Sequence, residues 1–360
     1  MENINWGRSL QSTKIDQEQF KLFSGQTPEE LYKSCLDKDG ELFHIIKSEH
    51  FDLDFLNKIF TTAKIIKNNY SGQPKWINSL LTNYSILNYF AQPSSRTFLS
   101  FSSAEALLGI RREELRSLET SSMVKGESDK DALRTISSYF DAIICRHPSN
   151  LFDLFSVWVM KESDREIPII NAGSGTSEHP TQALLDYYTI RESFEDINNL
   201  HIGFVGDCLR GRTVHSLSKV MSLYPNTKMS FIAPKEIQLD ENTKDFLKEK
   251  GINFQLVNSP LKEIVGDLDI TYMTRIQDEH GGNGVTSEQF KFQLDDLNNM
   301  KKNAILMHPM PKRDEIDPRI DYLSRDPKVM YWRQQRNGMW VRAALLLHLF
   351  HRSDSIMDIS

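Results

Sequence analysis

The sequence contains few cysteines, no long apolar run and no excess of positive charge. Cys35, Cys145 and Cys208 are the three cysteines of the 360-residue chain, and no two of them form a C-x-x-C pair. This spacing argues against a disulfide framework or a zinc site, so we expect reduced thiols in a cytoplasmic protein. No apolar run approaches the roughly 18 residues of a membrane helix. The net charge of −6 disfavours a general nucleic-acid binder.

The N-terminus also lacks the apolar core of a signal peptide. The opening stretch MENINWGRSLQSTKIDQEQF contains acids, which argue against an organelle-targeting address as well. Residues 1–40 are predicted to be an N-terminal extension of unknown role. Within them, Thr27, Pro28 and Glu30 have the spacing of a helix cap, a first turn and a capping box.

What the sequence does contain is a repeated alternation of strand and helix signals. Short apolar runs rich in β-forming residues each end at a polar cluster; they are residues 85–90, 141–145, 167–173, 201–207, 268–273 and 303–307. Helical patterns such as TVHSLSKVMSLY lie between them. This alternation predicts an α/β fold with parallel sheets flanked by helices, and the length suggests two domains. Because ligands bind at the carboxyl ends of such strands, the clusters predict one site or two adjoining ones.

The polar cluster after the first run has the sequence SSRT. Ser94, Ser95, Arg96 and Thr97 stand where a strand ends and a helix begins. A helix N-terminus offers free N–H groups and a partial positive charge, to which hydroxyls and a guanidinium add. The cluster predicts an anion site, most simply for phosphate. The alternative is a serine-rich helix cap followed by a surface arginine.

Polar residues follow two further strands. Arg146 comes directly after residues 141–145, and His179 precedes Pro180 at a predicted helix start, with Gln182 on the same face. His179 could polarise a carbonyl group by donating a hydrogen bond. The alternatives are a surface salt bridge for Arg146, and a capping histidine with a surface glutamine.

Three more cations stand near predicted loops or helix starts. Arg212 lies in GDCLRGRT and Arg275 in TRIQ, and two guanidinium groups suit the two carboxylates of one ligand. The alternative for each arginine is a structural ion pair. Lys125, in MVKGES, lies in a predicted loop, where a solvated lysine is the alternative. GDCLRGRT lacks the G-x-G-x-x-G pattern, which disfavours a dinucleotide site and hence a dehydrogenase.

The candidate residues include no evident nucleophile and no metal-ligand spacing. Ser94 has no base near it in sequence, and neither H-E-x-x-H nor a carboxylate cluster occurs. The cationic and hydrogen-bonding groups suit a reaction between two anionic substrates. Such a reaction would be catalysed by positioning and charge stabilisation rather than by covalent chemistry.

In combination, these motifs resemble the catalytic subunits of the aspartate carbamoyltransferase family. The resemblance covers roughly residues 42–352 and rests on the order of SSRT, KGES, RHP, HPTQALLD, GDCLRGRTVHSL, YMTRIQ, HPMPKRDEI and QQRNGMWVRAALL. It implies transfer of the carbamoyl group of carbamoyl phosphate to the amino group of L-aspartate, the committed step of pyrimidine synthesis. No metal or organic cofactor is implied. The implied domains are a carbamoyl phosphate-binding domain (41–180 plus 338–360) and an aspartate-binding domain (181–337).

The resemblance also implies roles for individual residues. The phosphate would be cradled by Ser94, Ser95, Arg96 and Thr97. The carbamoyl oxygen would be polarised by Thr97, Arg146 and His179, and the carbamoyl amide would be held by Gln182 and the backbone carbonyls of Pro309 and Met310. The aspartate carboxylates would be bound by Arg212, Arg275 and Gln277. Ser121 and Lys125 match a loop that reaches a neighbouring subunit's site in this family, so a homotrimer with shared sites is implied.

The sequence also departs from the family pattern. Phe98 replaces the second arginine of the usual S-T-R-T-R motif, and residues 278–290 form a glycine-rich stretch unlike the usual loop. Nothing in the sequence specifies a regulatory chain. The alternative functions are an ornithine-type carbamoyltransferase, whose family carries H-C-L-P where this chain has HPMP, and a non-catalytic relative that retains the fold.

Overall fold

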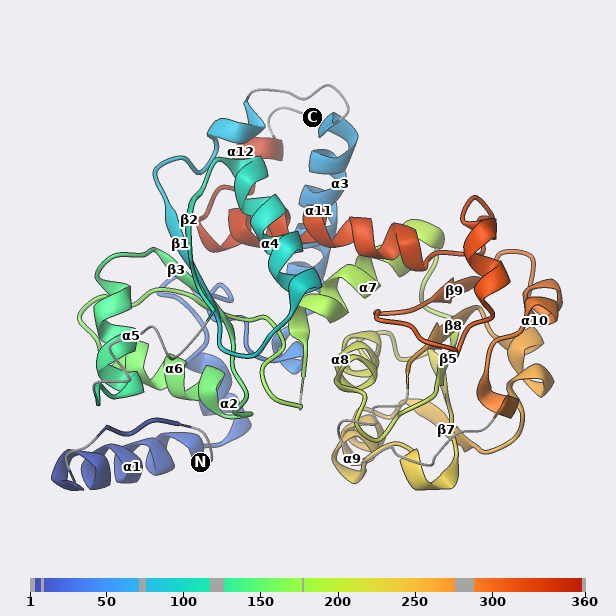
Figure 1. Cartoon of the computed structure of the whole chain (residues 1–360), viewed down its shortest axis with the longest axis horizontal. Helices are drawn as coiled ribbons and strands as arrows, with labels where there is room; N and C mark the ends of the chain where they lie inside the picture. Colours follow the sequence, from blue (N-terminus) through green and yellow to red (C-terminus); the bar gives the residue numbers. More distant parts are fainter. Residues whose placement is uncertain are drawn as a thin grey trace. The chain divides into compact units, whose positions relative to one another are not determined.

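The chain folds into two compact units, each built on one parallel β-sheet. The computed structural model describes residues 4–7, 10–70, 76–116, 126–176, 178–275 and 288–357. Unit 1 comprises Met1–Thr181 and Met339–Ser360, and unit 2 comprises Gln182–Gly338. Helices flank each sheet (Figure 1). The α/β fold predicted from the alternation of strand and helix signals is confirmed.

The sheet of unit 1 has four strands in the order β2-β1-β3-β4. The strands are β1 (Ser85–Phe90), β2 (Arg111–Leu115), β3 (Ala142–Arg146) and β4 (Ile169–Asn171). All neighbours pair in parallel. The helices between them are α4 (Ser95–Leu108), α5 (Asp129–Ser137) and α6 (Phe152–Lys161). In Figure 1, α4 lies on one side of the sheet and α5 and α6 on the other. The winding therefore reverses between β1 and β3, where such folds form a ligand crevice.

The sheet of unit 2 repeats this plan with five strands in the order β7-β6-β5-β8-β9. The strands are β5 (His201–Val205), β6 (Lys228–Ile232), β7 (Asn253–Val257), β8 (Ile270–Met273) and β9 (Ile305–Met307), all parallel. The helices are α8 (Arg212–Met221), α9 (Glu241–Glu249) and α10 (Leu294–Asn299). In Figure 1, α8 and α9 lie on one side and α10 on the other. The reversal here falls between β5 and β8.

The remaining helices belong to unit 1 or cross between the units. Those of unit 1 are α1 (Leu10–Ser24), α2 (Pro28–Lys33), α3 (Leu53–Tyr70) and α12 (Asp354–Met357). The crossing helices are α7 (Pro180–Ser193) and α11 (Tyr331–Leu349). The predicted capping box at α2 is confirmed, because the Thr27 hydroxyl accepts from the Glu30 N–H and the Glu30 carboxylate accepts from the Thr27 N–H. No described helix combines the length and the apolar character that a membrane span requires.

The N-terminal segment packs against the rest of unit 1. Phe20 of α1 is fully buried, and its ring lies 5.4 Å from that of Phe155 and 5.7 Å from that of Trp158, both in α6. The Asn5 N–H donates to the Asp129 carboxylate at 2.7 Å. These contacts attach part of the predicted N-terminal extension to α6 and to the start of α5.

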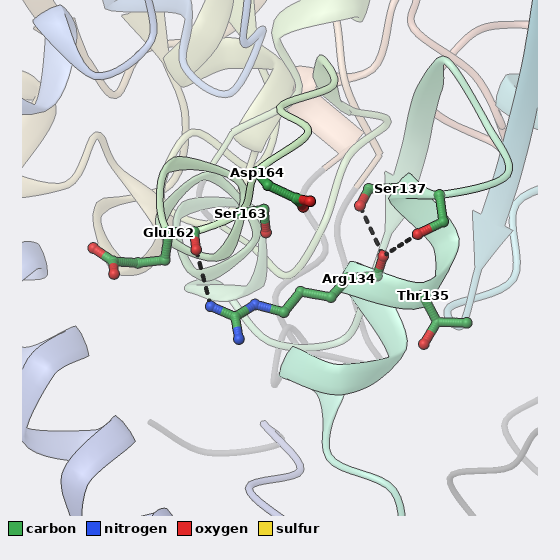
Figure 2. A pocket seen from close by; sticks show the side chains of 7 residues that line it. Arg134, Thr135, Ser137, Glu162, Ser163 and Asp164 are labelled. Carbon is green, nitrogen blue, oxygen red and sulfur yellow. Dashed lines mark hydrogen bonds between the residues drawn. The ribbon is translucent and has the colours of Figure 1, made fainter.

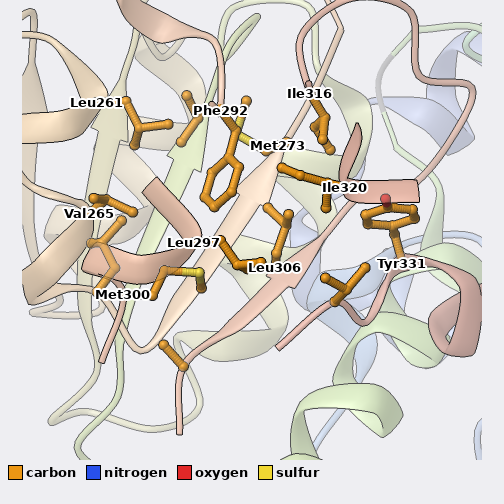
Figure 3. Packing of buried hydrophobic residues seen from close by; sticks show 14 of the residues in the cluster. Leu261, Val265, Met273, Phe292, Leu297, Met300, Leu306, Ile316, Ile320 and Tyr331 are labelled. Atoms are coloured by element: carbon orange, nitrogen blue, oxygen red, sulfur yellow. The ribbon is translucent and has the colours of Figure 1, made fainter. Parts of the chain in front are cut away.

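A cluster of buried apolar side chains supports β8 and β9 in unit 2. Met273 of β8 and Leu306 of β9 are fully buried among residues of the flanking segments, including Phe292, Leu297 and Ile320 (Figure 3). Burial of a side chain of this size contributes about 1.5–3 kcal/mol relative to leaving it exposed. The cluster thus holds in place two strands whose carboxyl ends carry predicted site residues.

Candidate functional site

The phosphate-site candidates of unit 1 lie at the start of α4. Ser94 is the N-cap residue of this 14-residue helix, with extended backbone (φ −158°, ψ 100°), and its hydroxyl makes no capping hydrogen bond. Ser95 and Arg96 are exposed, whereas Thr97 is buried. The first turn of a helix has backbone N–H groups without intrahelical partners, and the helix dipole favours an anion there. The geometry therefore suits a phosphate group.

Arg146 lies at the end of the neighbouring strand β3. It is 7% exposed, and its Nη1 donates to the backbone oxygen of Ala172, beyond the end of β4, at 3.1 Å. The backbone oxygen of Arg146 accepts from the Gln92 N–H at 3.0 Å, which ties the loop after β1 to the end of β3. Arg146 at the end of β3 is thus tied to the segment after β4 through its side chain and to the loop after β1 through its backbone.

His179 stands just before α7 and meets the start of α4. Its Nε2 lies 3.4 Å from the Thr97 hydroxyl, and both residues are buried. A hydroxyl, an imidazole and a guanidinium are the predicted donors to a carbonyl oxygen. Two of these donors, the Thr97 hydroxyl and the His179 imidazole, are in direct contact.

Gly173 brings Arg146 and His179 together, although the sequence analysis did not single it out. Its φ of +95° is left-handed, and an added Cβ would lie 2.7 Å from Arg146 Nη1 and 2.8 Å from His179 Cδ2. The side chain of Asn171 holds this turn, because its Oδ1 accepts from the N–H groups of Gly173 and Ser174 at 2.7 and 2.9 Å. The signal in the sequence is the stretch NAGSG directly after a strand, which marks a close backbone approach.

His147, next to Arg146, points into the core rather than to the site. Its ring stacks on Phe152 at 3.9 Å, and its Nδ1 accepts from the Ser149 N–H at 3.1 Å. Burial lowers the pKa of His147 to about 4, so the ring is neutral near pH 7. It therefore adds no charge to an anion site.

Phe98, which replaces an arginine of the family motif, is packed between two side chains. Its ring meets that of Phe90 edge-on at 5.4 Å, and the guanidinium of Arg116 lies 3.9 Å from its centroid. Arg116 also pairs with Glu114 at 2.8 Å. Phe98 itself carries no charge, but the guanidinium group of Arg116 places a positive charge over its ring.

In unit 2, Arg212 and Arg275 follow the two strands between which the winding reverses. Arg212 begins α8 after β5, Arg275 follows β8 by two residues, and both are half-buried. Burial, and then the positive charge of Arg275, lower the pKa of Arg212 to about 10. Both guanidinium groups are positively charged, so a ligand with two negative charges would interact favourably with each of them.

The strand ends beside these arginines are tightly packed. Gly206, after β5, has φ +111°, and an added Cβ would lie 2.3 Å from the backbone oxygen of Thr274. The N–H of Thr274 and its hydroxyl both donate to the backbone oxygen of Val205, at 2.8 and 3.0 Å. These contacts set the spacing of the segments that carry Arg212 and Arg275.

The predicted amide-binding residues also lie in unit 2. Gln182, 6% exposed, donates to Asp186 one turn later in α7 at 3.0 Å. Pro309 and Met310 are half-buried and follow β9, the neighbour of β8. The Met310 N–H donates to Nδ1 of His308 at 2.8 Å, which shapes this loop.

Some of the predicted site residues lie outside the part of the chain that the structure describes. Ser121, Lys125, Gln277 and most of residues 278–290 lie outside the described residues. The others fall into two groups, one at the carboxyl edge of each sheet. The first group is Ser94, Ser95, Arg96, Thr97, Arg146 and His179; the second is Gln182, Arg212, Arg275, Pro309 and Met310.

A surface hollow of about 430 Å³ in unit 1 contains none of these residues. It lies at the C-terminal ends of α5 and α6, and Arg134 donates across it to the backbone oxygen of Glu162 at 3.0 Å (Figure 2). Because α5 and α6 lead into β3 and β4, the hollow lies toward the amino ends of these strands. Ligands of such sheets bind at the opposite edge.

Comparison with known proteins matches most of the chain to one family. Residues 44–192 match the model of the aspartate/ornithine carbamoyltransferase carbamoyl-P binding domain, and residues 198–349 match that of the Asp/Orn binding domain.

Individual relatives agree with these matches. Aspartate carbamoyltransferase 3, chloroplastic, of Pisum sativum is 36% identical over 316 residues, which are 85% of this chain and 77% of the relative. The aspartate carbamoyltransferase catalytic subunit of Methanospirillum hungatei is 36% identical over 84% of this chain and 98% of its own length. The aspartate transcarbamoylase of Trypanosoma cruzi, solved with carbamoyl aspartate and phosphate, superimposes with a TM-score of 0.77 at 29% identity. That match covers 88% of this chain and 97% of the other.

Proposed function

This chain belongs to the aspartate/ornithine carbamoyltransferase family, and we propose that it is an aspartate carbamoyltransferase. It transfers the carbamoyl group of carbamoyl phosphate to the amino group of L-aspartate, giving N-carbamoyl-L-aspartate and phosphate. The observation that carries the choice of aspartate is the placement of Arg212 and Arg275 after β5 and β8, the two strands at which the winding of the second sheet reverses. Two clustered guanidinium groups fit a dicarboxylate, whereas the cationic side chain of ornithine would add a third positive charge.

The residues of unit 1 bind carbamoyl phosphate. The phosphate lies at the start of α4, where Ser94, Ser95, Arg96 and Thr97 supply donors and positive charge. Arg146, His179 and Thr97 donate to the carbamoyl oxygen as negative charge grows on it. Donors held in place before the reaction need no rearrangement in the transition state, and each is worth about 2.7–4 kcal/mol in comparable sites.

The reaction itself is a substitution at the carbamoyl carbon. The neutral amine of aspartate attacks this carbon, the bond from the carbon to the phosphate oxygen breaks, and the amine loses a proton. No candidate residue is an evident base, so the departing phosphate accepts this proton. If replacement of His179 abolished the basic limb of the rate–pH profile, His179 rather than phosphate would be the acceptor.

A turnover assay tests this function directly. The purified chain is incubated with carbamoyl phosphate and either L-aspartate or L-ornithine, and the ureido product and released phosphate are measured. We expect N-carbamoyl-L-aspartate and phosphate in equal amounts and no citrulline. Preferential use of ornithine would support the alternative of an ornithine-type enzyme. Absence of both products would support a non-catalytic relative.

The active assembly is a homotrimer in which neighbouring subunits share each site. This proposal is supported by the match of Ser121 and Lys125 to the family's shared loop, with Lys125 reaching the aspartate bound by the neighbour. We expect a mixture of Lys125→Ala and Arg146→Ala chains to regain activity that neither variant has alone, because some mixed sites contain both intact residues. Sedimentation of the same sample measures the assembly. Inactive mixtures in verified mixed trimers would contradict the sharing of sites.

The cellular location is a separate proposal. We propose the cytoplasm because Cys35, Cys145 and Cys208 are few and far apart in sequence, as is usual for reduced thiols. Relatives from pea carry the description chloroplastic, so fractionation of the source cells is the relevant test. An organelle fraction that contains the chain would overturn the assignment.

A further inference from the structure

A buried carboxylate in unit 2 receives hydrogen bonds from three side chains. Asp186 of α7 is fully buried. Its Oδ1 accepts from Gln334 Nε2 at 2.6 Å and from Gln182 Nε2 at 3.0 Å, and its Oδ2 accepts from the Tyr272 hydroxyl at 2.6 Å. Gln182 is one helical turn away, but Tyr272 and Gln334 come from distant segments, in β8 and α11 (Figure 1). This convergence is a property of the fold.

All three partners present a hydrogen atom to Asp186. An ionised carboxylate can only accept hydrogen bonds, so each glutamine must turn its NH₂ group toward it. Burial, and then the Asp186 charge, raise the pKa of Tyr272 well above its ordinary value, so the hydroxyl stays protonated and donates. The carboxylate therefore fixes the NH₂ end of each glutamine amide toward Asp186 and the C=O end away from it.

For Gln182, this orientation leaves the amide oxygen as the end that is not bonded to Asp186. No described residue donates a hydrogen bond to that oxygen. The NH₂ and C=O ends of a glutamine amide have similar shapes. Without Asp186, the Gln182 amide could therefore turn over and present a donor instead of an acceptor. Asp186 thus makes Gln182 an obligatory acceptor.

For Gln334, the same orientation reaches the loop after β9. Because its NH₂ faces Asp186, its Oε1 accepts from the His308 N–H at 2.8 Å. Pro309 and Met310 follow directly, and the Met310 N–H is held by the His308 ring at 2.8 Å. The backbone carbonyls of this loop are therefore anchored, through Gln334, to the carboxylate that orients Gln182.

We propose that Asp186 is a positioning residue that makes the site select an acyl group carrying an amino group. The proposal rests on the function proposed above, in which Gln182 and the carbonyls of Pro309 and Met310 hold the carbamoyl amide. The two backbone carbonyls are acceptors in any case, and the orientation imposed by Asp186 makes the free end of Gln182 an acceptor as well. An NH₂ group can donate to them, whereas a methyl group of similar size leaves them unpaired, and buried polar groups left unpaired reject such analogues.

Two inert phosphonates test this selectivity without depending on turnover. Phosphonoacetamide carries the amino group, and acetonylphosphonate carries a methyl group in its place. Calorimetric titration gives the ratio of their dissociation constants. We expect the unaltered protein to prefer the amide, and Asp186→Asn to lower this preference about ten- to a hundredfold. The loss should fall mainly on the amide, because the phosphate contacts of unit 1 are unchanged.

A matched control separates positioning from a general loosening of the helices. Thr189 of α7 accepts a hydrogen bond from Asn337 of α11 at 3.0 Å, so Thr189→Val breaks another contact between the same two helices. We expect it to lower the melting temperature without changing the affinity ratio. An equal change of the ratio in both variants would overturn the proposal, because the effect would then be structural.

Further outcomes keep the proposal testable if Asp186→Asn does not fold. Gln334→Leu leaves Asp186 facing Gln182 but breaks the link to His308, and we expect it to lower the preference partially. An unchanged ratio in a folded Asp186→Asn or Gln334→Leu protein would overturn the proposal, as would an unaltered protein that does not prefer the amide. A protein that prefers the amide but makes no carbamoyl-aspartate would contradict the proposed catalysis and leave the role of Asp186 standing.

Discussion

The two units share one topological plan but differ in the groups with which they would bind a negatively charged ligand. In each sheet the winding reverses beside the strand ends that carry the candidate residues, between β1 and β3 in unit 1 and between β5 and β8 in unit 2. Unit 1 offers a helix N-terminus, hydroxyl groups and arginines at the start of α4 and the end of β3. Unit 2 offers two guanidinium groups, those of Arg212 and Arg275. The topology supplies the place, and the residue types select the ligand.

Burial shifts the pKa of ionisable groups in both units. In unit 1, burial raises the pKa of Glu105 and Asp153 to about 7 and that of Asp129 to about 6. In unit 2, burial raises the pKa of Asp296 and lowers that of Arg212 to about 10. Buried acids favour their protonated form, so the stability of unit 1 should depend on pH between the ordinary carboxyl range and neutrality.

The largest expected effect concerns the paired guanidinium groups of unit 2. We expect Arg275→Ala to lower kcat/KM for aspartate about a hundredfold or more, because charge-assisted hydrogen bonds to carboxylates contribute about 1.5–3 kcal/mol each. Carbamoyl phosphate binding should stay nearly intact. Initial rates and calorimetry measure the two effects. Arg319→Ala, at an exposed arginine paired with Asp317 in the same unit, is the control. Unchanged aspartate kinetics in Arg275→Ala would contradict the proposal that unit 2 binds the aspartate carboxylates with its two guanidinium groups.

The second prediction concerns the turn that brings Arg146 and His179 together in unit 1. Gly173→Ala should weaken carbamoyl phosphate binding about tenfold or more, because the new Cβ would displace both side chains. Gly40→Ala is the matched control, since Gly40 has a similar φ of +79° with no heavy atom near the added Cβ. Calorimetry measures affinity, and thermal unfolding measures the backbone strain that both variants share. Equal affinities in the two variants would show that the turn does not position the site.

The smallest expected effect is on the pH dependence of stability. The pKa of Asp129 is raised from 3.8 to about 6 by burial, so the folded state holds this proton more tightly than the unfolded chain. Its stabilising contribution is therefore present below about pH 4 and is lost as the pH rises through about 6, amounting to about 1–3 kcal/mol. Urea unfolding of Asp129→Asn should show a flatter dependence over this interval. The matched control is Asp164→Asn, at an exposed carboxyl of the same unit. Parallel curves for Asp129→Asn and the unaltered protein would contradict the prediction.

Much of the fold was predictable because most strands carry their own signal. The apolar run of residues 85–90 coincides with β1, and each of the other apolar runs overlaps one strand of the structure. Three strands were missed. β2 has the sequence RREEL and is largely exposed, so it lacks the apolar pattern, and only pairing with β1 makes it a strand. The edge strand β7 (NFQLV) is exposed or half-buried, whereas its neighbour β6 (KMSFI) is largely buried; in both strands polar residues interrupt the apolar run.

The candidate site was only partly predictable. The rule that ligands gather at carboxyl strand ends located Arg146, His179, Arg212 and Arg275, because each follows a recognisable strand. Gly173 and Asp186 were not singled out. A glycine reveals its role only when the side chains around it are known, and a buried aspartate in a helix reveals its role only through its partners.

The sequence alone determined the fold class, the strand ends at which ligands would bind and the kinds of charge available there, since these follow from local patterns of apolar and polar residues. The tertiary structure decided which of those groups meet. Tyr272 and Gln334 reach Asp186 from segments far apart in the chain, and Gly173 lets both Arg146 and His179 lie close to its backbone. Such contacts depend on how the helices and strands pack, and packing is a cooperative property of the whole fold that no local stretch of sequence contains.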